Sequence, residues 1–102
     1  MPKAYVILTE AIHDPEGMEA YARAATPTVI NANANVLVIT RTPDVLEGEW
    51  HGDQTVVFEF ESVEAARAWY ESEAYQNARP VRERAATSNV VILPRFEPPQ
   101  PA

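Results

Sequence analysis

The 102-residue chain contains no cysteine. This absence excludes disulfide bonds, thiolate metal sites and cysteine nucleophiles. The chain has only two histidines, His13 and His51, which are too few for a histidine-rich metal site and leave only mixed ligation with carboxylates. We therefore expect neither a metal nor a cofactor. Because no Ser–His–Asp pattern is present either, covalent hydrolysis is not expected.

Basic residues and long apolar runs are also scarce. Eight Lys and Arg stand against 15 Asp and Glu, a formal net charge of −7, whereas nucleic-acid binding requires a basic patch. No apolar run approaches the roughly 20 residues that span a bilayer. The start, "MPKAYVILTE", lacks the longer apolar core and cleavage site of a signal peptide. We expect a cytoplasmic protein that binds neither nucleic acid nor membrane.

The composition that is present is typical of a small globular domain. Hydrophobic residues make up 46% of the chain and aromatic residues 9%. The length indicates one domain, over residues 1–96, followed by a proline-rich tail, "EPPQPA", at 97–102. A domain this short buries only a modest core, so association into a dimer would help to stabilise it.

Four stretches rich in β-branched and aromatic residues are bounded by turn residues, which is typical of strands. They are residues 3–10, 36–42, 55–60 and 89–96. In the third stretch Val56, Phe58 and Phe60 share one face, whereas Glu59 lies on the other. A short extended piece is also expected around residues 46–50.

Helical periodicity follows the first and third of these stretches. The first helix is expected from Glu16 to about Ile30, with Asp14 as its N-cap and Pro15 at its first position. Pro27 falls inside this range, and a proline within a helix costs about 3 kcal/mol, so we expect a kink or a break there.

The second helical stretch begins after Ser62, a good N-cap residue. We expect a break near Ser72 and a second helical piece over residues 73–87, although Pro80 fits poorly inside it. The resulting order, β–α–β–β–α–β, predicts an α+β ferredoxin-like fold with a four-stranded antiparallel sheet. Two helices cover one face of such a sheet, and a second copy of the chain is the simplest cover for the other face.

Residues 41–93, from "RTPDVLEGEW" to "NVVIL", resemble the family called domain of unknown function 1330, within the dimeric α/β-barrel superfamily. The resemblance covers nearly the whole chain. Its motif positions are Arg41, "LEG" at 46–48, Glu59 and Phe60, "AWY" at 68–70, "SEAYQ" at 72–76, and Arg82. Members of the superfamily include cofactor-free monooxygenases, isomerases, cyclases and some haem enzymes. They place the ligand between the sheet and the helices of each subunit, which is an analogy of fold only.

The sequence also departs from the family pattern. Asn33, Ala34 and Asn35 occupy the region where the family has Gly-Gly-Arg, and Thr42 and Pro43 replace the glycines expected after the second strand. Asparagine tolerates the left-handed backbone conformation, so the turn can survive the loss of glycine. "SEAYQ" stands for the family's "SPEYQ". These changes lie beside the family's cleft and are consistent with a specialised member.

Three residues are candidates for catalysis. Glu59 would be a general base if it were buried, and its alternatives are a structural pair with Arg41 or Arg82, or exposure at an edge. His13, in the loop before the first helix, is a second candidate base, and its alternative is a solvated side chain. Tyr21, on the first helix, could donate a hydrogen bond to a developing oxyanion.

Five residues are candidates for substrate binding. Arg41 and Arg82 could together hold a carboxylate or another planar anion, or could pair with nearby glutamates across a dimer. Trp69, Tyr70 and Tyr75 could form an aromatic wall around a small ligand, and the alternative is packing in the core and at an interface.

Three functions agree with these residues. The first is a cofactor-independent isomerase, cyclase or lyase that transfers protons on a hydrophobic carbonyl or aromatic compound. The second is a non-catalytic module that binds a small ligand, and the third is a structural dimer. We rank them in this order and expect a homodimer with a small-molecule ligand. The sequence identifies neither the substrate nor the reaction.

Overall fold

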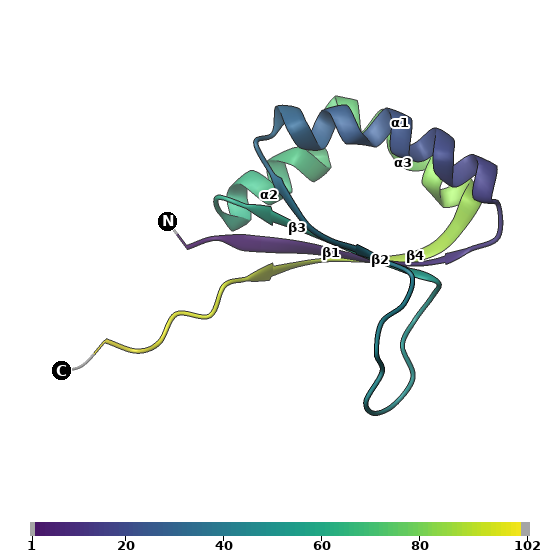
Figure 1. Cartoon of the computed structure of the whole chain (residues 1–102). Coiled ribbons are helices and arrows are strands. Elements are labelled where there is room, and N and C mark those ends of the chain that lie inside the picture. Colours follow the sequence, from purple (N-terminus) through teal and green to yellow (C-terminus); the bar gives the residue numbers. More distant parts are fainter. Residues whose placement is uncertain (1, 101–102) are drawn as a thin grey trace.

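The computed structural model describes residues 2–100 and shows three helices on one face of a four-stranded sheet (Figure 1). The elements are β1 (Ala4–Ile12), α1 (Pro15–Asn31), β2 (Asn35–Thr40), β3 (Gln54–Phe60), α2 (Val63–Glu71), α3 (Glu73–Ala85) and β4 (Ala86–Pro94). This is the expected ferredoxin-like fold, with the second helical stretch divided in two. No helix among the described residues is both long and apolar enough to cross a membrane.

The sheet is antiparallel throughout, in the order β2-β3-β1-β4. On β1, Val6 lies between Phe58 of β3 and Ile92 of β4, and all three side chains belong to the face that the helices cover. Because side chains alternate along a strand, the intervening residues form a second face. No helix of the described residues covers this second face, which we call the open face (Figure 1).

Serine and aspartate caps set the starts of the helices. The Asp14 side chain accepts a hydrogen bond from the Gly17 backbone N–H at 3.1 Å, and Ser62 Oγ accepts one from Ala65 N–H at 3.0 Å. Ser72 ends α2, and its Oγ also accepts from Tyr75 N–H at 3.2 Å to cap α3. The predicted caps and the predicted break at Ser72 are confirmed.

Two prolines lie inside continuous helices. α1 runs through Pro27, so of the two outcomes expected there a break is wrong, and α3 runs through Pro80 although that residue fitted poorly. Both rings are exposed. A carbonyl that loses its helical partner on the solvent side can bond to water, and the buried face of each helix keeps its contacts.

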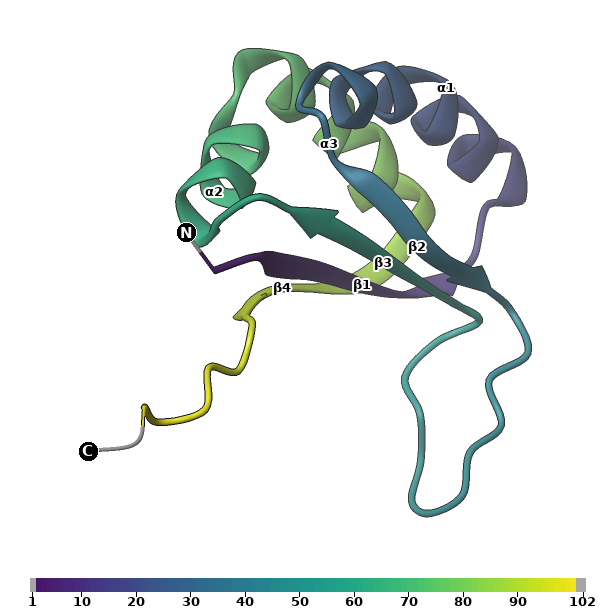
Figure 2. The same ribbon diagram turned by 60° about the vertical axis from the view of Figure 1, so that its left-hand side comes forward.

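The strand bounds differ from the expected ones. β4 spans Ala86–Pro94 and not residues 89–96, because Ala86 pairs with Ile12 and so extends both β4 and β1. Around residues 46–50 there is no strand: residues 41–53 form one long connection, the β2–β3 loop. Figure 2 shows this loop extending from the sheet on the side away from the helices.

Candidate ligand pocket

A cavity of about 400 Å³ lies between α1 and the sheet. Side chains from α1, β1, β2 and β3 line it, and most of the lining is apolar. The apolar walls include Leu8, Met18, Ala25, Val29, Ile39 and Phe58. A cavity of this size and character is typical of small-molecule sites.

Glu10 is the buried polar group of this cavity. It lies on β1 with only 1% of its surface exposed, and its Oε1 accepts a hydrogen bond from Gln54 Nε2 at 3.0 Å. Its Oε2 has no partner among the described residues. Burial raises the pKa of Glu10, whereas the Gln54 hydrogen bond and the charges of Arg82 and Arg41 oppose this rise. A carboxylate whose pKa is raised is a stronger base when it is ionised.

Arg82, on α3, is a buried cation whose charge lowers the pKa of Glu10. It is 4% exposed, and its Nε has no hydrogen-bond partner among the described residues. Burial lowers the pKa of Arg82, but the neighbouring Tyr75, Tyr21 and Glu10 outweigh burial and raise it overall. The guanidinium therefore stays charged and balances Glu10 when that carboxyl is ionised.

Tyr21 lines the cavity from α1 and also contacts residues of α3. Its hydroxyl lies 2.8 Å from the Tyr75 hydroxyl, and its ring centre lies 5.9 Å from Arg82 Cζ. Burial and the neighbouring Tyr75 raise the pKa of Tyr21 far above its usual range. Tyr21 is therefore a neutral phenol and a hydrogen-bond donor or acceptor, not a base.

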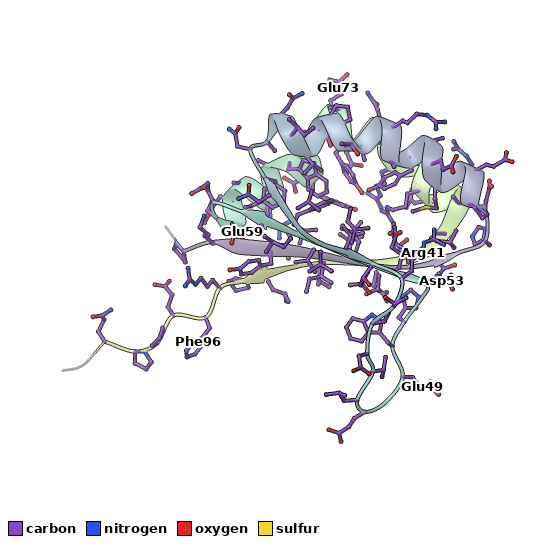
Figure 3. All side chains as sticks on the ribbon, viewed as in Figure 1. Arg41, Glu49, Asp53, Glu59, Glu73 and Phe96 are labelled. Carbon is purple, nitrogen blue, oxygen red and sulfur yellow. The ribbon has the colours of Figure 1, made fainter. Side chains whose placement is uncertain are left out.

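The structure brings only part of the predicted set to the cavity. Tyr21 and Arg41 line it, and Arg82 lies close to its buried carboxylate. Glu59 does not line it: Glu59 bonds to Lys3 Nζ at 3.7 Å and to Asn35 Nδ2 at 3.2 Å. Figure 3 shows Glu59 and Arg41 at opposite ends of the sheet. His13 is exposed before α1, outside the cavity lining.

The three predicted wall aromatics also lie outside the lining of this cavity. Trp69 is 3% exposed and donates a hydrogen bond from Nε1 to Thr28 Oγ1 at 3.0 Å. Its ring centre lies 4.2 Å from that of Tyr75, which is fully buried. Tyr70 packs against Trp69 and under the Arg79 guanidinium, 5.5 Å from its ring centre. These contacts attach the helices to the sheet and to one another.

Sequence reasoning missed Glu10, although a signal was available. Glu10 follows Val6 and Leu8 at spacings of two along the first strand, so alternation places its carboxylate on the same face as those core residues. Its register partners are Gln54 and Ser88, and Ser88 Oγ is another buried polar atom without a partner among the described residues. Polar side chains of three neighbouring strands therefore meet at one register position on the helix-covered face of the sheet.

Within residues 2–100 no group of three or more His, Asp or Glu side chains is placed to hold a metal ion.

Solved structures with the same fold come from several bacteria. RPA0582 of Rhodopseudomonas palustris, of unknown function, superposes with a TM-score of 0.72 at 21% identity over 95% of this chain and 85% of its own. A dimeric ferredoxin-like protein of unknown function from Jannaschia matches with a TM-score of 0.67, at 13% identity over 89% and 97%. SnoaB of Streptomyces nogalater, a cofactor-independent oxygenase, matches with a TM-score of 0.64, at 11% identity over 99% and 97%.

These likenesses show the fold, and two of these neighbours are of unknown function. No curated protein matches the sequence. The family model for domain of unknown function 1330 matches residues 3–96, which is almost the entire chain. The chain therefore belongs to the DUF1330 family.

Proposed function

We propose that this protein binds a neutral, largely apolar carbonyl compound in the helix–sheet cavity and transfers a proton on it without a cofactor. The observation that carries the proposal is the buried carboxyl of Glu10, a residue that lines an apolar cavity and whose Oε2 has no hydrogen-bond partner within residues 2–100. Burial raises its pKa. A buried titratable group with a perturbed pKa that lines a cleft is a candidate for a functional site.

The chemistry assigned to Glu10 is a proton transfer that needs no other reactant. Ionised Glu10 takes a proton from the carbon beside the substrate carbonyl, and the C–H electron pair moves to form an enolate. The Arg41 guanidinium, which also lines the cavity, compensates the charge on the enolate oxygen. Where the substrate is a β,γ-unsaturated carbonyl compound, the enolate is a dienolate, and Glu10 returns the proton to its γ-carbon; the double bond moves into conjugation, and the net change is an isomerisation. The same first step begins a cyclisation or a dehydration.

The charges of the cavity favour a neutral ligand. Glu10 and Glu19 line it together with Arg41, so the nearby acidic and basic groups offset one another. Cofactor-independent chemistry is known in this fold, because SnoaB is a cofactor-independent oxygenase. An oxygenation would need O2 as a second reactant after the enolate forms, and the cavity of this chain supplies no group that distinguishes that route.

Proton exchange on a model ketone tests the proposal directly. The probe is 2-tetralone in D2O, with loss of the proton signals beside its carbonyl followed by NMR. We expect Glu10→Gln to reduce the protein-dependent exchange rate about a hundredfold, the scale of general base catalysis. Glu59→Gln is the matched control, because Glu59 lies outside the cavity, and it should retain the wild-type rate.

Binding can be observed separately from catalysis. The chain has two methionines, and Met18 lines the cavity, so its 13C-labelled methyl signal reports occupancy. A shift of that signal by 2-tetralone without any exchange would favour the second function, a binding module without turnover. If neither a shift nor exchange occurs, the proposed site is wrong and the structural function gains support.

We propose in addition that the protein is a homodimer that uses the open face of its sheet. Val38, Val91 and Leu93 are among the large apolar side chains exposed there, with 40%, 45% and 45% of their surfaces accessible. Apolar surface of this kind on a sheet face favours an interface. Structural neighbours from Bacteroides fragilis, Jannaschia and Thermobifida fusca are described as dimeric.

A further inference from the structure

We infer that the β2–β3 loop is a dimerisation arm, and that its exposed apolar residues Val45 and Leu46, which we call its apex, pack against a second copy of this chain. The inference rests on the proposed homodimer and adds the segment that holds the two copies together. Figures 1 and 2 show the loop standing away from the sheet on its open-face side. The base of the loop, its apex and the surface beside it each support this role.

Hydrogen bonds fix the base of the loop to the central strand. Asp53 N–H donates to Glu10 O at 2.7 Å, and Asp53 Oδ2 accepts from Ile12 N–H at 2.7 Å. Nearer the apex, a hydrogen bond of 2.8 Å joins His51 Nδ1 and Thr9 Oγ1. A loop attached in this way loses little conformational freedom on binding, so its apex is preorganised for a partner.

The apex of the loop exposes apolar side chains to solvent. Leu46 is 87% exposed and Val45 45% exposed. The loop does not fold back over its own domain but extends from it (Figures 1 and 2). An apolar apex on a fixed stem exposes hydrophobic area that association would bury.

The surface beside the stem offers a place for such an apex. A hollow of about 370 Å³ lies between the loop and the open face, and its lining is mostly apolar. Ile7, Trp50 and Val91 line it, together with the hydrogen-bonded Thr9 and His51. Trp50 is held over the sheet by its Nε1, which donates to Thr55 Oγ1 at 2.7 Å.

The occupant that these features fit is a second copy. A twofold interface is self-complementary: a projecting apex on one copy meets a receiving surface on the other, and the reverse contact forms at the same time. The chain carries both elements on one side of its sheet. The tail after β4 leaves the same side and carries Phe96, 77% exposed, which gives a second projection for the same partner (Figure 2).

The test is the dimer dissociation constant of the full chain, measured by sedimentation equilibrium with native mass spectrometry as a second method. Leu46→Asp places a charge on the apex, and because Leu46 is already exposed the fold should survive, as circular dichroism can verify. We expect the dissociation constant to rise at least about thirtyfold, which corresponds to about 2 kcal/mol at 1.4 kcal/mol per tenfold change, the scale of a side chain at an interface centre. Ala24→Asp, on the exposed side of α1, adds the same charge away from the open face and should leave the constant unchanged.

Each result decides one part of the question. A wild-type dimer that Leu46→Asp dissociates and Ala24→Asp does not supports the arm. A wild-type dimer that Leu46→Asp leaves intact overturns the arm while the proposed homodimer stands. A wild-type protein that remains monomeric at all concentrations overturns both. None of these results bears on ligand binding in the cavity, because the Met18 methyl signal measures that binding separately.

Discussion

The hydroxyl oxygens of Tyr21 and Tyr75 lie 2.8 Å apart, and they join α1 to α3 behind the candidate pocket. The two rings meet edge to face, with centres 6.3 Å apart. Both side chains are buried, so each hydroxyl depends on the other in place of water. The pair fixes the helix layer above Glu10, which makes its removal a test of how the pocket is held.

We predict that Tyr75→Phe lowers the free energy of unfolding by about 1–3 kcal/mol, because the Tyr21 hydroxyl then remains buried without this partner. Tyr21→Phe should have a similar effect for the reciprocal reason. The double variant should lose less than the sum of the two, since no unpartnered hydroxyl of the pair remains. Urea denaturation of the four proteins measures this coupling. Strictly additive losses would show that the hydroxyls do not act as a pair.

The pH dependence of stability should report the burial of Glu10. Folding raises its pKa above the ordinary value of 4.5, so the folded protein keeps this proton at pH values where the unfolded chain has released it. The resulting contribution to stability is fully present below pH 4.5 and is lost as the pH rises through the higher folded pKa. Glu10→Gln cannot titrate and should lack this loss.

The measurement for Glu10 is the free energy of unfolding of wild type and Glu10→Gln at a series of pH values from 4 to 8. The variant should gain stability relative to wild type as the pH rises, and the difference should level off above the folded pKa. A difference that does not change with pH would mean that Glu10 is ionised in the folded protein as readily as in the unfolded chain.

Much of the fold was predictable because local rules and tertiary contacts agree. Asp14 and Ser62 cap helices where the sequence placed caps, since a short oxygen-bearing side chain before a helix stabilises its first turn. Ser72 lies at the predicted break and also caps α3. A break at Pro27 was wrong, and Pro80 lies inside a predicted helix in which it was expected to fit poorly. The cost of a proline depends on which side of the helix it faces, and that depends on packing.

The site was less predictable because it depends on register. Glu10 meets Gln54 and Ser88 only when β1 is aligned with β3 and β4, and those alignments involve residues far apart in the chain. Glu59 attracted attention as a carboxylate on an apolar strand. Side chains alternate along a strand, so Glu59 lies on the face opposite to that of Phe58 and Phe60, which is the face that the helices cover. The sequence pattern alone therefore placed Glu59 away from the helices.

Glycines in the β2–β3 loop offer a matched pair of substitutions. Gly52 and Gly48 both have positive φ, +84° and +76°. A Cβ on Gly52 would lie 2.5 Å from the backbone carbonyl atoms of Glu10, whereas a Cβ on Gly48 meets nothing within 4 Å. Gly48→Ala should therefore cost only the left-handed backbone penalty of about 1–2 kcal/mol.

Gly52→Ala should cost distinctly more than Gly48→Ala, because the clash adds to the same backbone penalty. The clash also displaces the Glu10 backbone, to which Asp53 N–H donates at 2.7 Å. Thermal denaturation of both variants measures the difference, and the Met18 methyl signal shows whether the pocket shifts with Gly52→Ala. Equal losses in the two variants would contradict the close approach of Gly52 to β1.

The contact between Trp69 and Thr28 joins α2 to α1, and it can be removed without a change of shape. Thr28 Oγ1 accepts from Trp69 Nε1 at 3.0 Å and donates to Ala25 O at 2.7 Å. Thr28→Val keeps the β-branched outline but leaves the buried indole N–H without this acceptor. We expect a loss of about 1–3 kcal/mol in the free energy of unfolding. Thr26→Val, two residues away and exposed, is the control and should change stability by no more than about 0.5 kcal/mol.

The chain has two tryptophans, so one of two indole N–H signals in an NMR spectrum belongs to Trp69. That signal should move upfield in Thr28→Val and stay in place in Thr26→Val; an unmoved signal in both variants would contradict the hydrogen bond.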